Sequence, residues 1–110
     1  MDYKTAVLAG MAFAPMQAFW EWFRNHATQA CVNGTALLGL HNGDVASLGD
    51  IDRESAGRIL RESFPSLSLP ATCPVCPKRF GDATVLSVTV HLNDVHRWKR
   101  ERIAAWVDSF

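Results

Sequence analysis

Cys73-Pro-Val-Cys76, followed after 14 residues by His91-Leu-Asn-Asp-Val-His96, decides how this chain is organised. Two thiolates and two imidazoles are ligands that zinc prefers in a tetrahedral site. The intervals of two, 14 and four residues lie within the range known for sites of two cysteines and two histidines. The pattern therefore predicts one zinc ion held by Cys73, Cys76, His91 and His96.

Two other uses of a Cys-x2-Cys pair fit this sequence less well. A redox pair of that spacing belongs beside an alternating pattern of strands and a helix, and the sequence lacks that pattern. A catalytic zinc keeps one coordination position open for water, whereas four good protein ligands close the site. We therefore expect a structural zinc in a protein that is not an enzyme.

The segment between the cysteines and the histidines predicts a helix that presents His91. Residues 84–90 contain many β-branched side chains, so strand and helix compete, and we favour the helix because it delivers His91 to the metal. Five residues of regular helix turn through about 500°, which would leave the two histidines about 140° apart. Both can reach one ion only if the helix ends near His96. Gly81-Asp82 is expected to supply the turn and cap ahead of it.

The N-terminal part of the chain predicts further helices. Residues 2–10 are expected to form a short helix, and Pro15 can occupy the first turn of a second one. Trp22 lies off the apolar stripe of this second helix, either exposed or at an interface. The stripe itself recurs at intervals of three and four residues and predicts a core face: Met16, Phe19, Trp20, Phe23, Ala27, Ala30 and Cys31.

Small residues dominate positions 30–40, which predicts a helix that a neighbouring element can approach closely. Cys31 is expected to be a small buried side chain there rather than a reactive thiol. The remaining elements are expected to be a turn at Asn42-Gly43, a helix capped by Asp50 or Asp52 and ended near Ser63 by Phe64-Pro65, and a last helix over about Lys99–Asp108.

The composition favours a small globular protein of mainly helical class. The chain has 110 residues, of which 48% are hydrophobic, and this is enough to form a core. The Ser-, Leu- and Pro-rich connector at 66–71 is the best candidate boundary. We expect a small, mainly α domain with a helical region at 1–68 and a C-terminal C2H2-like zinc-binding module with a last helix at 69–110.

The cysteine count and the lengths of the apolar runs indicate the cellular compartment of the protein. One unpaired thiol beside a metal-type pair favours a reducing compartment over a disulfide framework. No apolar run approaches the roughly 20 residues that span a bilayer. We therefore expect a soluble, cytoplasmic protein without a membrane partner.

The run Cys73-Pro-Val-Cys-Pro-Lys-Arg-Phe80, together with the two histidines, resembles the two-Cys, two-His (C2H2) zinc finger family over residues 73–96. Phe80 stands near the place of the core aromatic of that family. The helix face that reads bases in those fingers would here be residues 83–89, whose side chains suit burial better than base contacts.

A second resemblance covers the tail of the chain. His91-Leu-Asn-Asp-Val-His96-Arg-Trp98, with Ile103-Ala-Ala-Trp106 beyond it, resembles small uncharacterised proteins of bacteria and their phages. This resemblance brings no established activity. It implies that the zinc module and the last helix form one unit.

Three functions are compatible with these features. The leading hypothesis is a non-enzymatic, zinc-stabilised adaptor that binds another protein or itself through its aromatic N-terminal part, with no small-molecule substrate evident. The second is binding of DNA or RNA, although the net charge of zero argues against a general polycation. The third is a metal-dependent enzyme, which the four closed ligands disfavour. The nucleic-acid hypothesis depends on one basic segment: Arg97, Trp98, Lys99, Arg100 and Arg102.

Asp94 lies between the two histidine ligands in the sequence. Its carboxylate can accept a hydrogen bond from a ligand imidazole and so fix the orientation of that ring. A plain surface carboxylate at a helix end is the equally weighted alternative.

Overall fold

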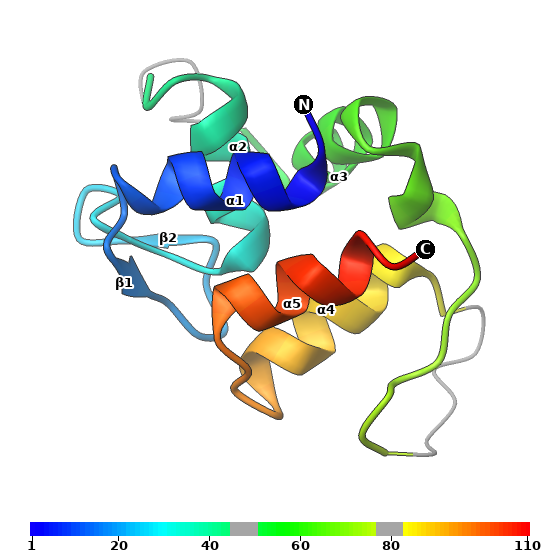
Figure 1. Ribbon diagram of the computed structural model, residues 1–110. Helices are drawn as coiled ribbons and strands as arrows, with labels where there is room; N and C mark the ends of the chain where they lie inside the picture. Colours follow the sequence, from blue (N-terminus) through cyan, green and yellow to red (C-terminus); the bar gives the residue numbers. More distant parts are fainter. Residues whose placement is uncertain (45–50, 77–82) are drawn as a thin grey trace.

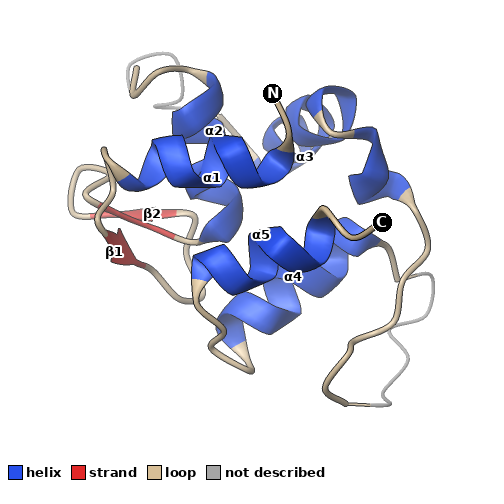
Figure 2. Ribbon diagram, in the orientation of Figure 1, coloured by secondary structure: helices blue, strands red, loops and turns tan. Residues whose placement is uncertain are grey.

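The computed structural model describes residues 1–44, 51–76 and 83–110. None of the helices in these residues is both long and apolar enough to cross a bilayer. The expected mainly helical class is confirmed (Figure 2), with a single small sheet among the described residues. The elements are α1 (Tyr3–Met11), β1 (Met16–Gln17), β2 (Phe23–Arg24), β3 (Gln29–Ala30), α2 (Val32–Leu40), α3 (Arg53–Ser63), the 3-10 helix η2 (Pro65–Ser68), α4 (Val85–Asp94) and α5 (Arg100–Val107).

Two aspartates begin helices as N-caps. Asp2 accepts a hydrogen bond from the Thr5 N–H at 2.7 Å, and Asp52 accepts one from the Ser55 N–H at 2.6 Å. Each bond satisfies a backbone donor that the first turn of a helix leaves free. Of the two caps expected for α3, Asp52 is the one observed, and Asp50 lies outside the described residues. The helix ends before Phe64-Pro65 as expected.

Helices α1 and α2 pack with their backbones in near contact (Figure 1), because each carries a glycine at the contact. A Cβ atom at Gly10 would collide with the carbonyl oxygen of Thr35, and one at Gly39 would collide with that of Ala6. The expectation that the small-residue segment permits close approach is confirmed. All residues of α2 except Leu40 are buried.

The prediction of a second helix after Pro15 is wrong. The described chain there forms a three-stranded sheet of order β1-β3-β2, in which β3 runs parallel to β1 and antiparallel to β2. Four non-glycine residues have positive φ angles, which a right-handed helix excludes: Trp20, Asn25, His26 and Ala27.

The apolar stripe in this segment is also divided between core and surface. Ala27 and Ala30 are buried, but Met16 is 60% exposed and Trp20 is 62% exposed. Trp22 is half-buried against the core. The three- and four-residue spacing therefore did not correspond to one helix face.

One hydrophobic core draws residues from both sides of the connector. Val7 and Leu37 belong to it from the N-terminal region, and Val88 and Ile103 belong to it from α4 and α5. Helix α5 lies beside α4 and below α1 in Figure 1, and the Lys4 N–H donates to the Asp108 carboxylate at 3.2 Å. The two regions thus share their apolar interior, while the boundary near residue 69 stays a prediction.

The glycine contacts between α1 and α2 give a test of this packing. Gly39→Ala should lower the free energy of unfolding by about 3 kcal/mol, because the new Cβ meets backbone that cannot move aside. Gly57→Ala in α3 is the matched control, since its Cβ would meet the end of the flexible Arg61 side chain at 3.2 Å and would lie in ordinary contact with Leu86 at 3.8 Å. That variant should be neutral or stabilising by up to about 1 kcal/mol. Chemical denaturation of both variants measures the difference, and equal effects would contradict the packing.

Candidate metal centre

The Cys73–Cys76 turn brings two sulfur atoms toward the end of α4. The N–H groups of Val75 and Cys76 point at the Cys73 sulfur, at 3.4 and 3.5 Å. Donors in this position stabilise negative charge on sulfur, as a metal-bound thiolate requires. Cys73 is buried and Cys76 is half-buried, so the turn faces inward at the edge of the core.

The turn is held in place by backbone pairing with the residues before α4. Pro70 and Thr84 form an antiparallel bridge, the Ala71 N–H donates to the Ala83 carbonyl at 3.1 Å, and the Val85 N–H donates to the Leu69 carbonyl at 2.8 Å. Thr84 and Ser87 cap α4 reciprocally, each side chain bonding the backbone N–H of the other. Gly81-Asp82, expected to supply this cap, lie outside the described residues.

Helix α4 ends where the histidine spacing requires. Its last residue is Asp94, and the N–H groups of Val95 and His96 both donate to the His91 carbonyl, at 2.9 and 3.3 Å. Arg97 then takes a left-handed φ of 53°, which turns the chain away. His96 therefore lies just past the helix, and its ring centroid is 4.6 Å from that of His91. Both expectations, a helix rather than a strand and an end near His96, are confirmed.

The four predicted side chains converge. One ligand atom from each of Cys73, Cys76, His91 and His96 lies within 4.8 Å of the other three. The Cys76 Sγ atom is 3.4 Å from the Nε2 atom of His91, close to the edge of about 3.6 Å that a tetrahedron with zinc bond lengths would have.

A buried atom without a partner supports the same conclusion. The Nε2 atom of His96 is buried and has no hydrogen-bond partner among the described residues. A buried polar atom left in this way is costly unless something else binds it, and a metal ion in the centre of the cluster would do so. The four residues are thus positioned to bind a metal ion.

Part of the segment that would read bases in a zinc finger is directed into the core. Val85, Val88 and Thr89 are fully buried. Those side chains cannot enter a DNA groove without unfolding α4. Phe80, the expected counterpart of the finger aromatic, lies outside the described residues.

Asn93, between the two histidine ligands, has an important role that the sequence reasoning missed. Its Oδ1 atom accepts from Gln17 Nε2 at 2.8 Å and from the Val32 N–H at 3.0 Å. Its Nδ2 group donates to the Ala18 carbonyl at 2.9 Å and to the Asp94 carboxylate at 2.8 Å. The sequence offered little signal for this role, because an asparagine near a helix end is ordinary.

Asp94 faces the loop before β2. Its Oδ1 atom accepts from the Trp20 N–H at 2.9 Å as well as from Asn93. This carboxylate thus links the end of α4 to the loop that carries Trp20. Its expected bond to a ligand imidazole stays a prediction.

The basic segment after His96 is divided between surface and core. Lys99 is exposed, and the guanidinium of Arg97 lies 4.5 Å from the centroid of the Phe19 ring. The guanidinium of Arg102 covers the Trp98 ring at 3.7 Å. These are cation–π contacts, and both arginines are exposed.

The inclusion of Arg100 in a nucleic-acid surface is corrected by the structure. Arg100 is only 3% exposed. Its guanidinium donates to the carbonyls of Ala14 and Pro15, at 2.7 and 2.9 Å, and to the Thr35 hydroxyl at 3.0 Å. It therefore ties α5 to α2 and to the segment that follows α1, and it cannot reach a phosphate.

Cys31 lies apart from the metal ligands. It is the N-cap of α2, where its sulfur accepts from the Gly34 N–H at 3.4 Å. Burial raises the pKa of this thiol to about 11, so it stays protonated at neutral pH. The expectation of a small buried side chain is confirmed.

Comparison with family models, curated proteins and solved structures gave no match to this chain. Neither the likeness to C2H2 fingers nor that to bacterial and phage proteins gains support from these comparisons. The metal centre is therefore defined by the geometry of its four side chains.

Single cysteine variants test the ligand assignment. Cys73→Ala should lose the metal and several kcal/mol of unfolding free energy, because metal binding and folding are coupled. Cys31→Ala, the matched control, should keep one metal ion per chain and lose only a packing contribution. Metal content by mass spectrometry and thermal unfolding measure both effects. Equal metal loss in the two variants would show that the assignment is wrong.

Proposed function

We propose that the metal is zinc and that its role is structural. Two sulfur and two imidazole ligands are the donor set that zinc favours over harder cations. Four protein ligands fill a tetrahedron, so a substrate or a reactive water would have no coordination position. This supports a non-enzymatic protein. It also supports a reducing, cytoplasmic setting, because both ligand thiols must stay reduced.

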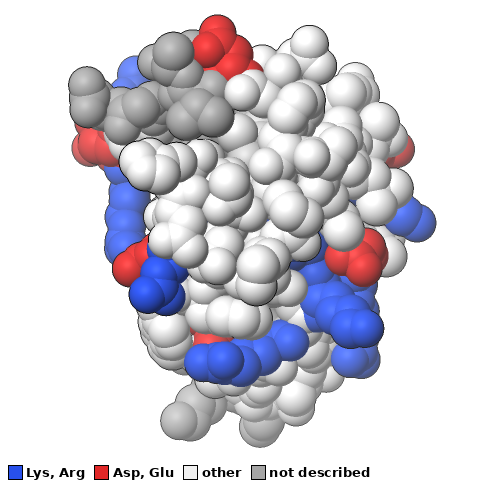
Figure 3. Space-filling model, turned by 90° about the vertical axis from the view of Figure 1, so that its left-hand side faces the viewer, with Lys and Arg blue, Asp and Glu red and all other residues white. Residues whose placement is uncertain are grey.

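The function that the geometry supports best is that of a zinc-stabilised adaptor, which binds another protein or a second copy of itself. The observation that carries this proposal is a group of large apolar side chains exposed between α1 and β2. Phe13 is 42% exposed, and Met16 and Trp20 are more so. Figure 3 faces the side of the molecule with β1 and β2 and shows a broad area without charged side chains. Such areas on small proteins often mark interaction surfaces.

The backbone at Trp20 adds to this argument. Its φ angle is 66°, in the left-handed region that bulky residues rarely occupy. The conformation is held by the bond from its N–H to Asp94. Strained residues of this kind tend to occur at functional sites, and here the strain displays an indole at the surface.

The likeness of residues 91–106 to bacterial and phage proteins is the sole ground for extending the proposal to a phage-related process. The likeness to C2H2 fingers likewise covers the metal module alone. Neither likeness identifies the partner of the adaptor.

Variants of the exposed apolar residues test the adaptor proposal. Trp20→Asn, which tolerates a left-handed backbone, and Met16→Ser should abolish recovery of a specific protein from an extract of the source cells, or should abolish dimers in sedimentation equilibrium. Leu69→Ser is the matched control, since Leu69 is 44% exposed but belongs to the connector. If all three variants recover the same proteins and sediment like the wild type, this surface is not the interface.

Nucleic-acid binding is the second candidate. The observation that favours it is the exposed set of Arg97, Lys99 and Arg102 beside the rings of Phe19 and Trp98. Two of these residues lie in the connection between α4 and α5, and Figure 3 shows Lys and Arg side chains along the lower part of the face with β1 and β2. A basic surface with adjacent aromatic rings suits single-stranded nucleic acid.

A salt series tests this second candidate. Three phosphate contacts would make the logarithm of the association constant fall with a slope of about −2 to −3 against the logarithm of salt concentration. Replacing Arg97, Lys99 and Arg102 by Gln, with Arg100 retained to preserve the core, should flatten that slope equally for all sequences. Fluorescence anisotropy with labelled DNA and RNA measures it. No binding by the wild type at low salt would eliminate this candidate.

A further inference from the structure

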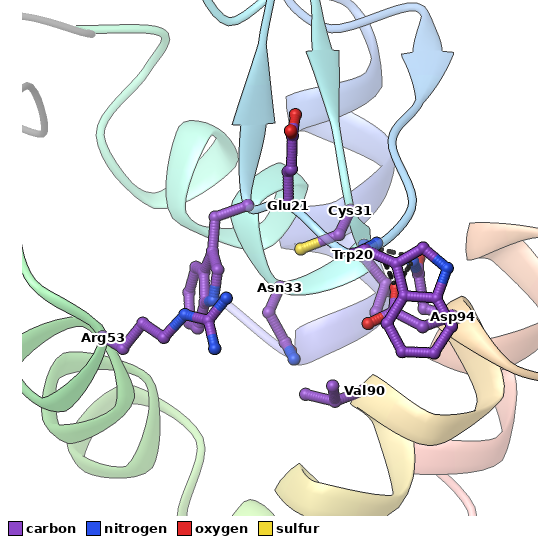
Figure 4. Close-up of a pocket in the computed structure, with 10 residues that line it drawn as sticks. Trp20, Glu21, Cys31, Asn33, Arg53, Val90 and Asp94 are labelled. Atoms are coloured by element: carbon purple, nitrogen blue, oxygen red, sulfur yellow. Dashed lines mark hydrogen bonds between the residues drawn. The ribbon is translucent and has the colours of Figure 1, made fainter.

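A pocket of about 320 Å³ lies between α3, the start of α2, the end of α4 and the loop 18–22 between β1 and β2. Its size is at the lower end of the range for ligand pockets, roughly 300–1,000 Å³. Figure 4 shows Arg53 at one end and Trp20 with Asp94 at the other, with Cys31, Asn33 and Val90 between them. We propose that this pocket binds a short peptide segment of a partner protein, in which an apolar side chain stands between an acidic and a basic residue. This inference rests on the adaptor function proposed above.

The middle of the pocket suits an apolar side chain. The polar groups that line it are already bonded within the protein: the Asn33 carboxamide accepts from the Tyr3 hydroxyl at 2.6 Å and donates to the Thr89 hydroxyl at 3.0 Å. Asn93 is likewise satisfied by its four bonds. The Cys31 thiol stays protonated, and Val90 is apolar and 43% exposed. An uncharged side chain placed here displaces water without breaking a hydrogen bond.

The two ends of the pocket carry opposite charges. Asp94 uses its Oδ1 atom for Trp20 and Asn93, and within the described residues its second oxygen accepts no bond. Glu21 also lines the pocket, but its carboxylate already forms an ion pair with the Arg24 Nε atom at 3.9 Å. A basic side chain of the ligand is therefore expected beside Asp94.

Arg53 at the other end is available for an acidic group. It is exposed, and it makes no ion pair with any residue that the structure describes. It is also the first residue of α3, where the positive end of the helix dipole disfavours a cation. An arginine at this position does not stabilise the helix. It can, however, bind an acidic group of a ligand.

The open rim favours a peptide over a small molecule. Trp20, Glu21 and Arg53 are all exposed, so the groups that recognise charge stand at the edges rather than in the floor. A ligand that uses both ends must extend past the rim, as a chain does. Trp20 can then close over the apolar side chain with its indole.

Selection from a library of random displayed peptides tests this proposal. Wild-type protein should enrich peptides with an acidic, an apolar and a basic residue in neighbouring positions. Arg53→Glu should exchange the preferred acidic residue for a basic one, and Glu at the first position of α3 should not harm the helix. Arg58→Glu, exposed on the same helix but outside the pocket, is the matched control and should keep the wild-type preference.

Affinities of the selected peptides, measured by fluorescence anisotropy, complete the test. Trp20→Asn should weaken binding at least tenfold, as expected for an aromatic anchor. Peptides that ignore both Arg53→Glu and Trp20→Asn would bind elsewhere, which overturns the pocket assignment but leaves the adaptor proposal intact. If the wild type enriches no peptide, the pocket assignment also fails, while the adaptor proposal is decided separately by the extract and sedimentation measurements.

Discussion

The carboxamide of Asn93 makes four hydrogen bonds, and three of them attach Gln17, Ala18 and Val32 to α4. A buried side-chain amide offers two donor and two acceptor positions, and here all four are used. Without them, the backbone groups at Ala18 and Val32 would lose their partners in a dry interior, at a cost of about 1–3 kcal/mol each. The sheet, the start of α2 and the wall of the pocket all depend on this one residue.

Because Asn93 lies between His91 and His96, the sheet, the start of α2 and the wall of the pocket are coupled to the metal centre. His91 on the last turns of α4 belongs to the metal cluster, and Asp94 on the same turns accepts from the Trp20 N–H. A metal ion that holds this turn would also hold Asn93 and Asp94 in the positions from which they form their hydrogen bonds. The zinc we propose would therefore stabilise the surface that displays Trp20 without contacting it. Small proteins often use a structural metal in this way, because their cores alone give little stability.

Sequence patterns predicted the parts of the structure whose causes are local or stereochemically specific. The ligand spacing led to the cluster and to the end of α4 near His96, and Asp2, Asp52 and Pro65 marked helix limits. The segment 15–31 could not be predicted in this way, because two of its carbonyls, those of Pro15 and Ala18, accept from Arg100 and Asn93, far along the chain. Arg100 resembled its surface neighbours in sequence, and only tertiary contacts show that it is internal.

The contact of α1 with α5 has a consequence for the order of events during synthesis. The Lys4 N–H donates to the Asp108 carboxylate, and the carbonyls of Ala14 and Pro15 accept from the Arg100 guanidinium. Contacts of such long sequence separation slow folding, because the loop entropy is lost before the contact forms. On the ribosome, α1 cannot complete its contacts with α5 until α5 has left the exit tunnel. Until then, the part of α1 that packs on α5 stays uncovered in the nascent chain, and chaperones are expected to bind it during this period.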